Sequence, residues 1–127
     1  MVVELRAGAT TLRLTCDERN WCRASLGTPS GSGQELGADD KNVLVSRLRA
    51  ALAGNIGPTI GQIDGLDVSW VTTLSEMHST LYAADVDGDL ELFFQDATGR
   101  LTARIGLSSL IRAQWMQQLD AIGTKRS

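Results

Sequence analysis

One pattern occurs twice in this chain and constrains its fold more than any other feature. Apolar and polar residues alternate in residues 12–26 and again in residues 90–105, and Asn20 or Gly99 lies in the middle of each stretch. Alternation with a period of two indicates a strand with one buried face, and both central residue types tolerate positive φ, so each stretch predicts a β-hairpin. A helical pattern follows each hairpin. Because one sheet with one helix leaves an apolar sheet face exposed, two such units can cover that face for each other.

The remaining elements follow from local signals along the 127 residues. Strands are predicted at residues 2–6, 10–16, 21–26, 66–74 and 80–85, with a meander that turns at Gly88 and Gly99. Helices are predicted from Asp39 or Asp40 to about residue 53 and from Ser108 or Ser109 to Gly123. Residues 28–33 are expected to form a Gly/Ser loop and residues 55–61 a linker.

These elements predict a single α+β domain with antiparallel β-sheets and two helices. Its plan is a duplicated β-hairpin-plus-helix (ββββα-like) unit, with pseudo-repeat halves of about residues 1–54 and 62–123. The element order is similar to that of the Whirly and Pur groups of single-strand nucleic-acid binders. The similarity lies in the order of the elements and in no residue motif.

Two cysteines, Cys16 and Cys22, fall on the inward face of the first hairpin. A cross-strand disulfide is geometrically conceivable there, but the favoured interpretation is two small buried thiols in a reducing compartment. His78 is the only histidine, so neither a metal site nor a cofactor is expected. No apolar run approaches the roughly 20 residues that span a bilayer, so we expect no membrane segment and a cytoplasmic location.

The candidate catalytic and metal-binding residues do not have the sequence spacing that known motifs require. Asp85, Asp87 and Asp89 alternate like a calcium loop, but the glycine stands at the fourth position instead of the sixth. The Asp87-Gly88 pair predicts a hairpin turn instead. His78 lies near Glu76, yet no nucleophile motif accompanies it, so the chain is not expected to be an enzyme.

The outward face of the two hairpins is the candidate binding surface. Aromatic rings alternate there with arginines, which could stack unpaired bases and neutralise phosphates. Its candidate residues are Arg13, Trp21, Arg23, Phe93, Arg100 and Arg104. Three other readings remain: the rings lie under a helix, form a homodimer seam, or cover arginine stems.

Charge ranks the functional hypotheses. The formal charge of −3 and the pI near 5.0 favour a protein partner over nucleic acid. The leading hypothesis is a small acidic non-catalytic binding protein, of adaptor, inhibitor or immunity-like type. It would use a sheet face or the 28–33 loop against a protein partner, with self-association as one form of binding. The alternative is single-stranded nucleic-acid binding through the Arg/aromatic sheet face, and the third hypothesis is an enzyme around Glu76 and His78.

Overall fold

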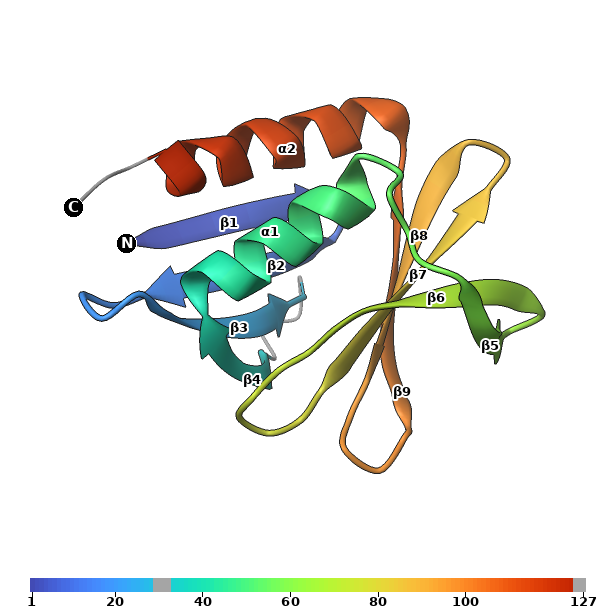
Figure 1. Ribbon diagram of the computed structural model, residues 1–127, viewed down its shortest axis with the longest axis horizontal. Coiled ribbons are helices and arrows are strands. Elements are labelled where there is room, and N and C mark those ends of the chain that lie inside the picture. Colours follow the sequence, from blue (N-terminus) through green and yellow to red (C-terminus); the bar gives the residue numbers. More distant parts are fainter. Residues whose placement is uncertain (29–32, 125–127) are drawn as a thin grey trace.

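Two antiparallel sheets and two helices make up the fold (Figure 1). The computed structural model describes residues 1–28 and 33–124. The first sheet contains β1 (Val2–Ala7), β2 (Thr10–Cys16), β3 (Trp21–Gly27) and β4 (Gln34–Asp40), and α1 (Lys41–Leu52) follows it. The second sheet contains β5 (Thr59–Ile63), β6 (Leu66–Thr73), β7 (Thr80–Val86), β8 (Asp89–Gln95) and β9 (Leu101–Leu107), and α2 (Ser109–Thr124) follows it. The chain is an α+β domain, as the sequence predicted.

Both sheets share one hydrophobic core. In each sheet the strands follow one another in sequence order, so every neighbour is a hairpin partner and period-two alternation places one residue in two on the inner face. The inner faces and both helices contribute to a single cluster, whose largest fully buried member is Trp115 of α2. The two helices lie side by side and run in opposite directions (Figure 1).

Local signals set the bounds of α1. The side chain of Asp40 accepts hydrogen bonds from the backbone N–H groups of Asn42 and Val43, which are otherwise unsatisfied at a helix start. The helix ends before Gly54, whose φ is +87°. Arg112 of α2 donates to the carbonyl of Leu52 at 2.8 Å and so ties the two helices together.

Two strands were not predicted from the sequence. Residues 55–61 were expected to be a linker, but Thr59–Ile63 pairs with β6. Residues 34–40 contain three acids and a glycine, a composition that disfavours strands, and yet they pair with β3 around a bulge. Residues 29–32 of the predicted Gly/Ser loop lie outside the described residues.

The prediction of free thiols is wrong, because Cys16 and Cys22 form a disulfide. The two residues are direct partners in the β2–β3 register, with their Cα atoms 4.0 Å apart, so their side chains meet on the same face.

The structure places four strands before α1 and five before α2. Counting back from each helix matches β2 and β3 with β7 and β8, whereas the residue pattern matched them with β8 and β9. The two units share an order of elements, and the residue-level repeat stays a prediction.

Candidate functional site

Three of the predicted site residues lie together on the outer face of the first sheet. Arg13, Trp21 and Arg23 point away from the core, and each of them has a carboxylate partner among the described residues. Arg13 donates to Glu4 at 2.8 Å, and Arg23 lies 3.5 Å from Glu76. The charged side chains of this surface therefore form a network of ion pairs.

Glu4 accepts hydrogen bonds from two arginines of this face. Hydrogen bonds from Arg13 and from Arg6 hold the pKa of Glu4 below its usual range. Glu76 also accepts a 2.7 Å hydrogen bond from the indole N–H of Trp21. A phosphate would have to displace these carboxylates, so this face does not have the free cations of a nucleic-acid surface.

Glu76 reaches this face from the loop between β6 and β7. Its backbone N–H donates to the carbonyl of Ala38 at 3.0 Å, which forms an isolated bridge to the edge strand β4. The carbonyl of Glu76 packs against Gly37, where a Cβ atom would lie only 1.9 Å from the oxygen. The second sheet thus contributes a carboxylate to the outer face of the first.

The prediction that Phe93 is part of an exposed face is wrong, since its exposed fraction is 0%. It lies in a small second core with Val68 and Ala84, against which Tyr82 packs. The physical reason is hydrophobic packing on the outer side of the second sheet, where Ile63, Leu66 and Leu101 also pack against this small core.

Arg104 covers Phe93 instead of facing solvent freely. Its guanidinium carbon lies 5.1 Å from the centre of the Phe93 ring, and its Nε donates to Glu91 at 2.8 Å. The hydrogen bond to Glu91 raises the pKa of Arg104 above its ordinary value, although partial desolvation opposes this.

Arg100 lies neither with the residues on the first sheet nor with Phe93 and Arg104 on the second. It is exposed in the turn before β9, where its backbone N–H donates to Asp96 at 3.0 Å. The hydroxyl of Thr98 donates to the same carboxylate and, with these backbone bonds, lowers the pKa of Asp96. The six predicted residues are therefore divided among the two sheets and a turn and do not form one site.

The catalytic readings gain no support from the geometry of the described residues. Glu76 is engaged by Trp21 and Arg23, and His78 is exposed in a turn with a φ of +54°. The predicted turn at Asp87-Gly88 is confirmed, since both residues have positive φ.

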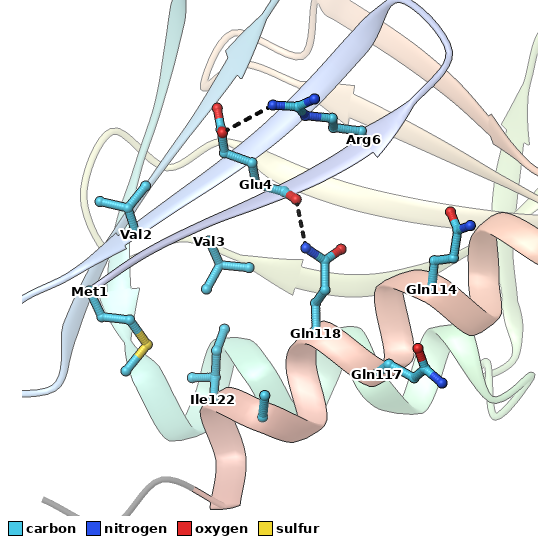
Figure 2. Close-up of a pocket in the computed structure, with 10 residues that line it drawn as sticks. Met1, Val2, Val3, Glu4, Arg6, Gln114, Gln117, Gln118 and Ile122 are labelled. Atoms are coloured by element: carbon cyan, nitrogen blue, oxygen red, sulfur yellow. Dashed lines mark hydrogen bonds and ion pairs between the residues drawn. The ribbon is translucent and has the colours of Figure 1, made fainter.

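A groove that was not predicted from the sequence lies between the edge strand β1 and helix α2 (Figure 2). Its volume is about 1190 Å³, and Val3 and Ile122 face each other across it. The α2 wall carries three glutamines, Gln114, Gln117 and Gln118. No sequence signal marks this groove, because its walls are more than 100 residues apart in the chain.

The hydrogen-bonding pattern of β1 shows which backbone groups border the groove. Met1 and Cys16 exchange two hydrogen bonds, so the backbone groups of Val2, and by alternation those of Glu4 and Arg6, face away from β2. No strand of the described chain pairs with that edge.

Helix α2 caps part of this edge. Gln118 donates to the carbonyl of Glu4 at 3.0 Å, and the indole N–H of Trp115 donates to the carbonyl of Arg6 at 2.8 Å. Covering an edge in this way protects it against unwanted strand pairing. The edge at Val2 has no such cap in the described structure, and the Val2 side chain is 58% exposed.

No known protein family matches this chain, and no curated protein matches it either. Among the helices of the described residues, none has the length and apolar character needed to cross a membrane.

Proposed function

We propose that this chain is a small non-catalytic binding domain that takes up an extended segment of a partner protein at the edge of β1. The observation that carries the proposal is the open start of that edge beside the β1–α2 groove. An extended segment could add as a further strand, with backbone hydrogen bonds supplying affinity and the groove selecting side chains.

The residues that line the groove favour a partner segment without charged side chains. Glu4 and Arg6 form an ion pair with each other at 3.4 Å, and the three glutamines of α2 are neutral. Val3 on the β1 side and Ile122 on the α2 side give the groove an apolar part. The Gln118 side chain is exposed, so its bond to Glu4 can be exchanged for one from the incoming strand.

Single-stranded nucleic acid remains the alternative, and it ranks second. Arg13, Arg23 and Arg104 all have carboxylate partners, and the chain carries a net charge of −3. The cytoplasmic location predicted from the sequence also stays a prediction. The Cys16–Cys22 disulfide weighs against it, because disulfides persist in oxidising compartments and are rare in the cytosol.

A peptide-display selection on the purified protein tests the proposal, and the best enriched peptide is then used as the probe. Val2→Pro removes a backbone N–H that faces away from β2, so it blocks strand addition without breaking the β1–β2 ladder. Loss of one backbone hydrogen bond, about 1 kcal/mol, should weaken probe binding about fivefold or more. Val2→Thr, which keeps the N–H, is the matched control.

Three outcomes would contradict the proposal: no enriched peptide, a probe that binds Val2→Pro as well as the native chain, or a probe that protects a different surface from amide exchange. Salt-sensitive binding of labelled single-stranded DNA would move the alternative ahead. Light scattering on the same sample shows whether a second copy of the chain is the partner.

A further inference from the structure

A separate pocket lies where α1 meets the second half of β6. The pairing of β5 with β6 extends only to Ser69, so residues 70–73 of β6 have no strand on that side. Helix α1 lies there instead, and the pocket between them has a volume of about 80 Å³. Arg47 and Trp70 form part of its lining, and Ala50, Ile56 and Val71 provide apolar walls.

Arg47 is held in place by two contacts. Its guanidinium carbon lies 5.0 Å from the centre of the Trp70 ring, and its Nη1 donates to the hydroxyl of Thr72 at 3.2 Å. Thr72 is only 1% exposed, so this acceptor is fixed by the core. A guanidinium held on an aromatic face is already oriented for planar, bidentate hydrogen bonding.

Arg47 has no carboxylate partner among the described residues, whereas five other arginines of the chain do. The arginines that form ion pairs are Arg6, Arg13, Arg23, Arg49 and Arg104. A guanidinium carries five N–H donors, and the hydroxyl of Thr72 takes only one of them. The remaining donors of Arg47 are thus available to an acceptor that enters from outside.

Trp70 is also held in place although it is 43% exposed. Its indole N–H donates to Thr73 at 2.9 Å, and the Thr73 hydroxyl lies 3.1 Å from that of Thr80. An exposed but anchored tryptophan beside an arginine has the composition of an interaction hot spot.

We propose that Arg47 and Trp70 bind a carboxylate at the end of a short aliphatic chain. Two parallel N–H···O bonds from one guanidinium match a carboxylate. The pocket, with a volume of about 80 Å³, has room for a small group such as a carboxylate with its adjoining methylene. A glutamate or aspartate side chain of a peptide has this chemistry, and so does a small free carboxylic acid.

Titration followed by ¹H–¹⁵N NMR tests this site at constant ionic strength. The probes are sodium propionate for the free acid and N-acetyl-glutamate amide for the peptide side chain. N-acetyl-glutamine amide and inorganic phosphate are the comparison probes. With one or both carboxylates, we expect the chemical shifts of the Trp70 indole N–H and the Arg47 Nε–H to change and to saturate at millimolar probe concentrations. The probe that binds more tightly shows whether the natural ligand is a free acid or a peptide side chain.

Variants then assign the effect to the guanidinium. Arg47→Gln should abolish the saturable shifts, and Arg47→Lys, which keeps the charge but loses the planar fork, should weaken binding at least fivefold. Arg19→Gln is the matched control, because Arg19 is exposed in the β2–β3 turn and removal of its charge leaves the pocket intact.

The inference is overturned if neither carboxylate gives saturable shifts, if the glutamine or phosphate probe binds as well as the carboxylates, or if Arg47→Gln retains the native affinity. An effect of Arg19→Gln as large as that of Arg47→Gln would overturn it too, because binding would then depend only on overall charge. The site shares no residue with the β1–α2 groove, so failure of either proposal leaves the other standing.

Discussion

Gly37 should tolerate no side chain, because two independent features oppose one. Its φ is +129°, a region that residues with a Cβ atom rarely adopt. A Cβ atom would also lie 1.9 Å from the carbonyl oxygen of Glu76 and 2.9 Å from its carbonyl carbon. Both are backbone atoms, so the contact cannot be relieved by rotation of a side chain.

The cost of Gly37→Ala can be worked from these two features. A strained φ costs about 1–3 kcal/mol, and insertion of a methyl group that forces a backbone shift costs about 1–3 kcal/mol. The free energy of unfolding should therefore fall by about 2–6 kcal/mol, a large part of the roughly 5–15 kcal/mol typical of one domain. The shift would also stretch the 3.0 Å hydrogen bond from Glu76 to Ala38.

Urea unfolding compares this variant with Gly57→Ala. A Cβ atom at Gly57 meets no atom within 4 Å, so the control should cost nothing or add about 0.4–1 kcal/mol. In the folded fraction of Gly37→Ala, the Trp21 indole resonance should move, because Glu76 no longer holds its N–H. A Gly37→Ala protein within about 0.5 kcal/mol of the native chain would refute the reasoning.

Two further predictions concern charge and covalent structure. Because the folded-state pKa of Glu4 is lowered, the stabilisation from its charged form is present above about pH 4.3 and is lost as pH falls through the folded pKa. Arg13→Gln should raise that pKa toward its ordinary value in a carboxyl NMR titration, and an unchanged titration would contradict the assignment of its main cause. For the disulfide, the Cys16→Ser/Cys22→Ser protein should lose about 2 kcal/mol in urea unfolding, as expected for so short a closed loop. No loss of stability would show that the β2–β3 register alone holds the hairpin.

The elements that sequence reasoning found are those with local signals. Asp40 caps its own helix, and Asp87-Gly88 makes its own turn. Strand β4 lacks such a signal, because it depends on a bulge opposite β3 and on the distant Glu76. Its glycine was the available clue, since an isolated glycine in a strand often marks a bulge or a close approach of backbone.

For the candidate binding surface, the sequence predicts on which face of a sheet each side chain lies, but not whether that face is exposed. Alternation assigns Phe93 to the outer face of the second sheet, but it does not say whether that face is covered. Coverage depends on packing between side chains that are far apart in the sequence, such as Val68 and Phe93. An aromatic and arginine pattern along one strand therefore cannot separate a base-stacking surface from a small second core.

The sequence also does not show which arginines have carboxylate partners in the fold, so the proposed sites differ from the face predicted from the sequence. Arg13 and Arg23 were chosen for their charge, yet that charge is already matched by Glu4 and Glu76. Arg23 and Glu76 lie 53 residues apart, so pairing of this kind is invisible to composition and to spacing. The two proposed sites rest instead on groups that have no such partner among the described residues, namely backbone groups at the open edge of β1 and the guanidinium of Arg47. Backbone groups and one oriented cation favour a peptide over a polyanion, because neither offers the row of free charges that a phosphate chain requires.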